Sequence, residues 1–238
     1  MNQILISKRI YVTKEMKRKK KTYKMLYMLS ILTIIVLLVY YFVAEGGRNS
    51  QEALGKEILS QVNDDTTVEE HAIVIALNDN ENENEIVPLE STENSDSPVT
   101  STVKASNGNS YNAEAILSYP KLGINYPVLS DENDSLLKVS LCKYWGPKPN
   151  EVGNYCIVGH NYRSGKMFGK LSMASNGDQI ILKDLSGRSV TYAVYNMYNV
   201  NPTDVSCTTQ LTNGNKEITL ITCTNFGKER FVVKAREV

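Results

Sequence analysis

The apolar and polar positions divide this chain into three stretches. Residues 25–44 are a continuous apolar run without a charged side chain. Residues 45–110 are polar and acidic, with comparatively few apolar residues. From residue 111 onward, short apolar runs alternate with Gly, Pro, Asn and Ser, which is typical of strands joined by turns. The pattern predicts a long apolar helix, a linker and a mostly β domain.

The apolar run at residues 25–44, MLYMLSILTIIVLLVYYFVA, has the length of a membrane span. A helix needs about 20 apolar residues to cross a bilayer. Aromatic residues gather where such helices meet the membrane surface, and four lie near the ends of this run: Tyr23, Tyr27, Tyr40 and Tyr41. We therefore expect a transmembrane helix. A cleaved signal peptide is the alternative, but the run is long for one and Ala44-Glu45-Gly46 is a poor cleavage site.

The charges are unevenly distributed, although 26 basic and 26 acidic side chains give a formal net charge of zero. Residues 1–24 are strongly basic, whereas residues 45–96 are acidic. Because cytoplasmic flanks of membrane helices are rich in Lys and Arg, we expect a cytoplasmic tail at residues 1–24 and an extracellular remainder. Residues 111–238 have mixed charge without a basic stripe, which argues against nucleic acid as a partner.

Residues 45–110 are expected to be a disordered, acidic extracellular linker or stalk. Residues 51–62 have apolar side chains at helical spacing, so a short helix in the stalk is expected there. His71 lies in the linker and is expected to be solvated. The apolar run at residues 72–77 leaves open whether the linker folds back over the β domain that follows.

Residues 111–238 contain about eight strand-like runs. A closed barrel fits this number, because closure removes exposed strand edges. We predict an eight-stranded β-barrel with short helices. The expected strands lie at residues 113–119, 123–129, 154–160, 178–183, 189–199, 217–223 and 230–236, with a helix or strand pair at 136–144 and a short helix at 166–173.

The cysteine and histidine content argues against a metal centre or a disulfide framework. The four cysteines are Cys142, Cys156, Cys207 and Cys223, and no two of them form a CxxC pair. With only two histidines as well, the usual zinc spacings are absent, and we expect no metal and no cofactor. A single bridge between Cys142 and Cys156 stays open.

The clearest candidate site lies in residues 218–233, ITLITCTNFGKERFVV, which predict two strands joined by a short loop. An antiparallel hairpin would bring Cys223, at the end of the first strand, beside Arg230, at the start of the second. A guanidinium beside a thiol favours the thiolate, and it can also donate to a developing oxyanion. Each residue also has a structural alternative, because a strand cysteine is often a small buried hydrophobe.

His160 is the one histidine of the predicted β domain and ends the strand-like run NYCIVGH. A histidine at a strand end is often only a satisfied polar residue. Together with Cys223 and Arg230, however, it completes the set for thiol acyl transfer: a nucleophile, an acid/base and an oxyanion donor.

Two motifs resemble those of the sortases. TLITC at residues 219–223, followed by Arg230, resembles the sortase signature TLxTC…R. GNYCIVGHNYRSGKMFGKL at residues 153–171 is similar to the sortase histidine segment. The order His, Cys, Arg and the layout of anchor, linker and C-terminal barrel at residues 111–238 also match.

This resemblance implies a membrane-anchored cysteine transpeptidase of Gram-positive bacteria with an eight-stranded barrel. Cys223 would attack an LPxTG-like sorting signal of a surface protein and form a thioacyl enzyme. His160 would protonate the leaving amine and deprotonate the incoming one, and Arg230 would orient the substrate and stabilise the oxyanion. The expected acceptor is the amine of the cell-wall precursor lipid II. The alternatives are a cysteine peptidase that only hydrolyses and a non-catalytic binding domain.

The resemblance leaves the sortase class open between B and D. The sequence MFGKL after His160 is similar to class B, but the short segment between the strands at 189–199 and 217–223 is more similar to classes A or D. No Asp-Pro-aromatic lid motif of pilin-polymerising enzymes occurs. We expect the loop from Asn201 to Lys216 to bind the sorting signal, with Asn201, Thr203 and also Thr222 as substrate-binding residues.

Overall fold

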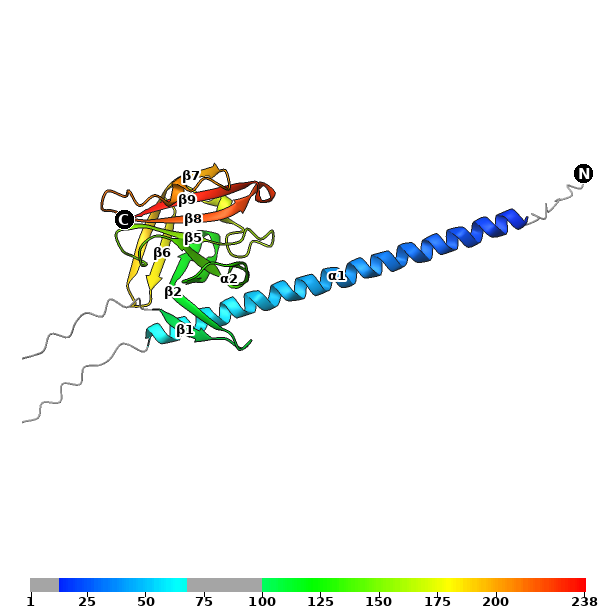
Figure 1. Ribbon diagram of the computed structural model, residues 1–238, viewed down its shortest axis with the longest axis horizontal. Coiled ribbons are helices and arrows are strands. Elements are labelled where there is room, and N and C mark those ends of the chain that lie inside the picture. Colours follow the sequence, from blue (N-terminus) through cyan, green and yellow to red (C-terminus); the bar gives the residue numbers. More distant parts are fainter. Residues whose placement is uncertain (1–12, 68–99) are drawn as a thin grey trace, which may run out of the picture. The chain divides into compact units, whose positions relative to one another are not determined.

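The computed structural model describes residues 13–67 and 100–238 (Figure 1). His71 and the apolar run at residues 72–77 lie outside the described residues. The helices are α1 (Lys14–Thr67) and α2 (Asp134–Val139). The strands are β1 (Ser101–Lys104), β2 (Ser110–Tyr119), β3 (Ile124–Leu129), β4 (Leu141–Trp145), β5 (Gly153–Val158), β6 (Gln179–Asp184), β7 (Ser189–Val200), β8 (Lys216–Thr224) and β9 (Glu229–Glu237).

Eight of these strands form a closed barrel, as the sequence predicted. The order is β2-β3-β4-β5-β8-β9-β7-β6, and β6 pairs back with β2 to close the ring. The short strand β1 pairs only with β2 and adds to the barrel from outside. Most neighbours are antiparallel, but β3–β4 and β5–β8 are parallel. Closure satisfies the backbone groups that an open sheet would leave at its edges.

The barrel interior follows from the two-residue period of the strands. Alternate residues of β2 and β8, such as Leu117, Tyr119, Ile218 and Leu220, point into one apolar cluster that all eight strands line. The phenol of Tyr155 also reaches inward and donates to the buried Glu114 carboxylate at 2.6 Å. Because these buried side chains occupy the barrel interior, we look for the functional site at a barrel end or on its outer face.

Two short elements differ from the sequence expectation. Residues 136–144 were expected to be either a helix or a strand pair, and they contain the end of helix α2 followed by β4. The expected helix at 166–173 is only a 3-10 turn at Leu171–Met173. Phe168 and Leu171 are fully buried in the barrel core, so packing sets the shape of this segment more than helix propensity does.

The four cysteines are all free thiols. Residue Cys142 of β4 pairs in register with Val158, and Cys156 of β5 pairs with Trp145. The bridge between Cys142 and Cys156 that the sequence left open is therefore absent. Both thiols are buried, and burial raises the pKa of each to about 12, so neither is a nucleophile at neutral pH.

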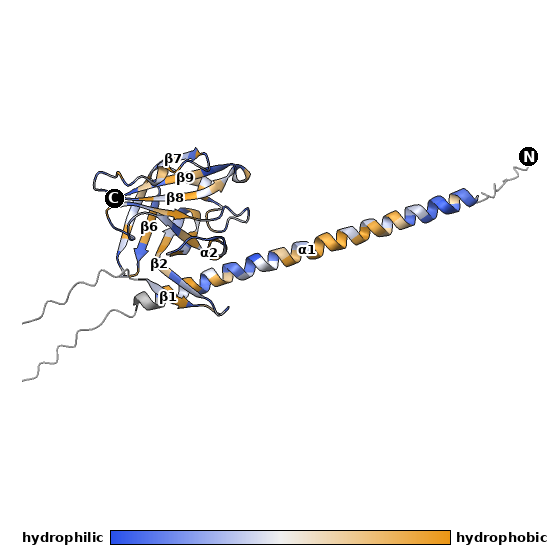
Figure 2. Cartoon of the chain, in the orientation of Figure 1, coloured by the Kyte–Doolittle hydropathy of each residue, from blue (hydrophilic) through white to orange (hydrophobic). Residues whose placement is uncertain are grey.

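Helix α1 contributes to two units of the chain, which divide between Asn49 and Ser50. In the first unit, the apolar side chains of residues 25–44 are almost all exposed, and Figure 2 shows this stretch as a continuous hydrophobic band between polar ends. Among the described residues, this is the one helix long and apolar enough to cross a membrane. It is the candidate span that the sequence predicted.

The second unit includes the part of α1 from residue 50 onward, which packs against the barrel. Leu54, Ile58 and Val62 lie three to four residues apart on one face and are buried. They form a second apolar cluster with residues of β1, β2 and α2. The sequence analysis placed these residues and β1 in a stalk, whereas the structure has both within the compact unit 50–238.

Candidate active site

The predicted hairpin is confirmed by the pairing of β8 with β9. The two strands are antiparallel, and Cys223 lies directly opposite Arg230. Directly opposite residues of such a ladder have side chains on the same face, with Cβ atoms about 5 Å apart. The thiol and the guanidinium therefore share one face of the sheet at the same end of the hairpin.

His160 reaches the same row through the parallel pairing of β5 with β8. That register joins Gly153 to Lys216 and continues to Val158 and Ile221. Two residues beyond the last pair on each strand come His160 and Cys223. The backbones of the three candidate residues are thus brought to the same end of β5, β8 and β9, three neighbouring strands of the barrel.

Two side-chain hydrogen bonds hold the ends of β5 and β8 together around this row. The buried hydroxyl of Thr222 donates to the Gly159 carbonyl at 2.7 Å. The side-chain amide of Asn161 donates to the Cys223 carbonyl at 2.8 Å. One bond precedes and the other follows His160 in the chain. They continue the parallel ladder past its last backbone pair and set the strand end of His160 against that of Cys223.

The turn after His160 is fixed by close packing. A Cβ atom on residue 159 would lie 2.5 Å from a methyl carbon of Leu141 and 2.9 Å from the Phe168 ring, so any larger residue before the histidine would force these two buried side chains to shift. The backbone amide of Phe168 donates to the His160 carbonyl at 3.1 Å. The Tyr162 ring lies 5.2 Å from the imidazole, centroid to centroid. These contacts explain the glycine of the GH pair seen in the sequence.

Arg230 and the β8–β9 loop form the other flank. The guanidinium donates to the carbonyls of Gly227 at 3.1 Å and Glu229 at 3.3 Å, which orients it along the loop. At the loop tip, Phe226 is 89% exposed, and its ring lies 5.7 Å from the guanidinium carbon of Arg163. Arg163 belongs to the turn after His160, so this contact joins the two loops that flank the row.

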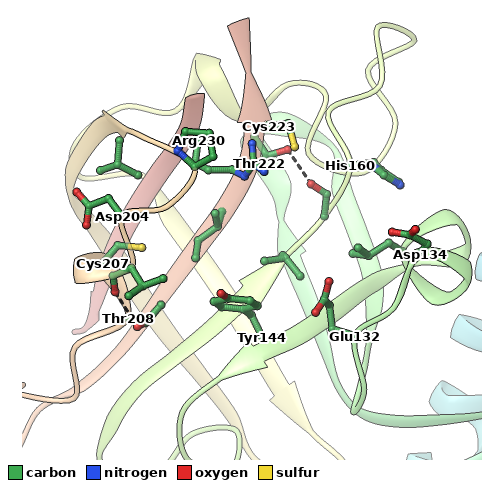
Figure 3. A pocket seen from close by; sticks show the side chains of 17 residues that line it. Glu132, Asp134, Tyr144, His160, Asp204, Cys207, Thr208, Thr222, Cys223 and Arg230 are labelled. Atoms are coloured by element: carbon green, nitrogen blue, oxygen red, sulfur yellow. Dashed lines mark hydrogen bonds between the residues drawn. The ribbon is translucent and has the colours of Figure 1, made fainter. Parts of the chain in front are cut away.

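A pocket of about 350 Å³ opens in front of the row (Figure 3). Cys223 lies between Arg230 and His160 in this view, with Glu132 and Asp134 on the histidine side. Asp204, Cys207 and Thr208 line the opposite side. The remaining lining residues are mostly apolar: Leu137, Tyr144, Val158, Gly159, Val200, Pro202, Val205, Ile221 and Thr222.

The electrostatic setting favours a neutral imidazole. Burial lowers the pKa of His160 below its usual 6.5, and Lys138 lowers it further, while Asp134 partly offsets both. Burial disfavours the charged form of any base, because a cation loses its hydration there. At neutral pH His160 is therefore ready to accept a proton.

The residues expected to bind substrate have different surroundings. Thr222 lines the pocket, but its hydroxyl is already bonded to Gly159. Asn201 and Thr203 are exposed and are not among the lining residues. The expected loop does border the pocket, but through Val200, Pro202, Asp204, Val205, Cys207 and Thr208.

Sequence analysis missed three polar residues of the site. Glu132 and Asp134 come from the segment between β3 and α2, far from His160 in the chain, so no local pattern joins them to it. Asn161 directly follows His160, but its bond to the Cys223 carbonyl depends on the parallel register of β5 and β8. Within residues 13–67 and 100–238, no cluster of three or more His, Cys, Asp or Glu residues is suited to a metal ion.

A family model of the sortase domain matches residues 117–238. This chain belongs to the sortase family. The match begins within β2 and runs through His160 and the hairpin of Cys223 and Arg230 to the end of the chain. Sortases are cysteine transpeptidases, the class that the two sequence motifs predicted. None of the functionally curated proteins matches this sortase.

Solved sortase structures share its fold. A lid mutant of sortase A from Corynebacterium diphtheriae aligns with a TM-score of 0.50 at 22% identity, covering 56% of this chain and 74% of that one. Another structure of sortase A from Corynebacterium diphtheriae aligns with a TM-score of 0.49 at 23% identity, covering 54% of this chain and 61% of that one. A sortase D5 transpeptidase from Clostridium perfringens aligns at 0.48 and 25% identity, over 53% and 79%.

Proposed function

We propose that this sortase is a membrane-anchored cysteine transpeptidase that cleaves an LPxTG-like sorting signal and transfers the surface protein to a cell-wall amine such as that of lipid II. The observation that carries the proposal is the row of His160, Cys223 and Arg230 across three neighbouring strands at the mouth of one pocket. The family assignment indicates the reaction class. The row supplies a nucleophile, a base and an oxyanion donor that line the same pocket.

In the first half-reaction, the Cys223 sulfur attacks the threonine carbonyl of the signal, and the thiol proton passes to the neutral imidazole of His160. The carbonyl oxygen becomes an oxyanion, which the Arg230 guanidinium stabilises by hydrogen bonding. The peptide C–N bond then breaks, and His160 returns its proton to the leaving glycine amine. A thioester between Cys223 and the surface protein remains, with no net change in protons.

In the second half-reaction, the acceptor amine attacks the thioester carbonyl and gives a proton to His160. The C–S bond breaks, the new amide bond forms, and the proton returns to the Cys223 sulfur. Glu132 and Asp134 line the histidine side of the pocket, so they favour the approach of a cationic amine over an anionic acceptor, and the amine attacks in its neutral form after its extra proton has passed to solvent. The product carries the surface protein on the cell-wall precursor.

The apolar side of the pocket supports a signal that begins with apolar residues. Val200, which pairs with Arg230 between β7 and β9, lines the space together with Pro202, Val205 and Ile221. Leucine and proline of an LPxT segment would lose apolar surface to water there, and burying a leucine contributes about 1.5–3 kcal/mol. The threonine carbonyl would then face Cys223. In this arrangement residues Asn201 and Thr203 act at the rim of the pocket, and Thr222 acts through its backbone.

The membrane layout is part of the same proposal. Residues 1–24 are a basic cytoplasmic tail, residues 25–44 cross the membrane, and the catalytic unit faces the outside. Both substrates of a Gram-positive cell-wall sortase are presented at that face. A protease added to intact cells should remove the catalytic unit but leave an epitope tag at the N-terminus protected.

A fluorogenic peptide panel tests the function. The full chain in detergent is incubated with LPxTG-type peptides, with and without an added amine such as triglycine. Amine-dependent formation of the ligated product, measured by mass spectrometry, supports transpeptidation. Cleavage that gives only the free acid identifies a hydrolase. No cleavage of any peptide, together with a Cys223 thiol that does not react with iodoacetamide, identifies a non-catalytic domain. Cys223→Ala is the matched control in each case.

A further inference from the structure

The segment of α1 at residues 50–63 contacts both elements that flank His160. One is the turn after His160, which contains Lys166. The other is α2, whose first residue Asp134 lines the pocket and whose last residue is Val139. The helix touches the first through an ion pair and the second through apolar packing. No sequence pattern predicts either contact.

The ion pair joins the Glu52 carboxylate to the Lys166 ammonium. Both side chains are partly buried, with 21% of the Glu52 surface and 26% of the Lys166 surface exposed. Glu52 also pairs with Lys56 of its own helix at 3.2 Å, but the Lys56 side chain is 70% exposed. The Lys166 hydrogen bond is the main reason that the pKa of Glu52 is lowered. Partial burial makes the Lys166 pair the stronger of the two, because water screens the Lys56 pair more.

The contact with α2 is a close backbone approach. A Cβ atom on residue 55 would lie 2.5 Å from the carbonyl oxygen of Val139, so glycine alone permits the observed distance between the two helices. Leu54 and Ile58, on either side of Gly55, are buried in the same cluster as Val139. Nearby, the Glu57 carboxylate accepts hydrogen bonds from the Ser106 amide at 2.8 Å and hydroxyl at 2.7 Å. The helix is therefore fixed to the barrel on both sides of its contact with α2.

We propose that residues 50–63 of α1 are a positioning element of the active site, in which Glu52 holds the turn after His160 through Lys166 and Gly55 seats α2. The element acts on His160 through its neighbours and touches no substrate. This inference rests on the proposed function only in those experiments that measure turnover. An imidazole displaced by about 1 Å loses much of its efficiency in proton transfer, so the expected effect falls on kcat more than on KM.

The ion pair is tested in the full chain with two matched lysines on one carboxylate. Lys166→Met should lower kcat for the sorting peptide roughly three- to tenfold with little change in KM, whereas Lys56→Met should leave both unchanged. Glu52→Gln should reproduce the Lys166→Met effect. The charge-swapped double variant Glu52→Lys with Lys166→Glu should recover most of the loss, which isolates this pair from other contacts of Lys166. Equal effects of the two lysine variants, or an unchanged kcat in Lys166→Met, would overturn the role of the pair.

The helix contact is tested with two glycines of the same helix. Ala is a better helix former than Gly at both Gly55 and Gly46, but only at Gly55 does the added methyl group meet another backbone. Gly55→Ala should therefore lower kcat at least about tenfold, while Gly46→Ala should not. Equal kcat values for the two variants would contradict the seating of α2.

A second readout separates this inference from the proposed function. The pKa of His160 is followed by NMR of the full chain in micelles, with the His71→Gln variant assigning the signal. Burial lowers this pKa, so a loosened turn or helix should raise it toward 6.5 in Lys166→Met and Gly55→Ala and leave it unchanged in Lys56→Met and Gly46→Ala. If no sorting peptide is cleaved, this measurement still decides whether residues 50–63 position His160. An unchanged pKa in all four variants would refute the inference even in an active enzyme.

Discussion

The two flanks of Cys223 are held in place by different kinds of contact. Arg230 lies on the next strand of a hairpin, a few residues further along the chain, and antiparallel pairing fixes it opposite the thiol. His160 comes from a strand far away in sequence, and parallel pairing of β5 with β8 brings it alongside. Side-chain bonds from Thr222 and Asn161 then complete what the ladder leaves unpaired.

This difference teaches where the site is robust and where it is sensitive. The arginine flank depends on a local turn and should tolerate changes elsewhere in the barrel. The histidine flank depends on a distant pairing, a packed turn and a helix that leads from the candidate membrane span. Substitutions far from the pocket should therefore act on the histidine flank first. The following predictions test that asymmetry, beginning with the largest effect.

Loss of the Cys223 thiol, which lies between the two flanks, should abolish turnover. Cys223→Ala removes the nucleophile, so no thioacyl enzyme should be detected by mass spectrometry.

His160→Ala should lower kcat about 10²–10⁴-fold, as expected for removal of an acid/base. His71→Ala, which removes the other imidazole of the chain, is the control and should leave kcat unchanged. Comparable losses in both histidine variants would contradict the assignment of His160.

Removal of the guanidinium should have a smaller effect than removal of the imidazole. Arg230→Ala should reduce kcat/KM about 10²–10³-fold, because one oxyanion donor is lost. Arg230→Lys retains the charge without the planar fork and should recover only part of the activity. Steady-state kinetics with the sorting peptide measures both variants. Near-normal turnover in Arg230→Ala would rule out its role in stabilising the oxyanion.

The two bonds between the strand ends should contribute unequally. Thr222→Val leaves the Gly159 carbonyl without its buried hydroxyl donor, so the free energy of unfolding should fall by about 1–3 kcal/mol. Thr222→Ser keeps the hydroxyl and should stay close to the parent. Chemical denaturation measures both. If valine and serine variants are equally stable, the bond to Gly159 does not hold the strand ends.

Asn161→Ala breaks the more exposed bond of the two. A bond of this kind contributes about 0.5–1.5 kcal/mol to stability, so the free energy of unfolding should fall by no more than that amount. If the same energy holds His160 in place, kcat should fall at most about tenfold. Turnover and thermal unfolding of the same sample give the two quantities. A large loss of stability without a change in kcat would show that Asn161 has a structural role alone.

The smallest predicted effects are opposite shifts in the pKa of His160. Lys138 lowers this pKa and Asp134 raises it. Lys138→Gln should therefore raise the pKa and Asp134→Asn should lower it. The acid limb of kcat/KM reports the basic form of His160 in the free enzyme, and it should move to higher pH in the first variant and to lower pH in the second. Shifts in the same direction would show that another group controls the limb.

The sequence by itself determined the parts that depend on local patterns. The uncharged run at residues 25–44 predicted the apolar helix, and alternation with turn residues predicted the barrel strands. The pairing of Cys223 with Arg230 was also predictable, because a short loop between two strands leaves little choice of register. The resemblance of the two motifs to sortases then named the family and pointed to His160.

Only the tertiary structure decided the parallel pairing that sets His160 beside Cys223, and with it the bonds of Thr222 and Asn161. A parallel ladder between distant strands leaves no local mark in a sequence. The docking of residues 50–63 was predicted incorrectly as a stalk for a related reason. Leu54, Ile58 and Val62 predict a helix with one apolar face, but only the fold supplies the surface that buries it. Periodicity identifies a face that must be covered, and packing decides what covers it.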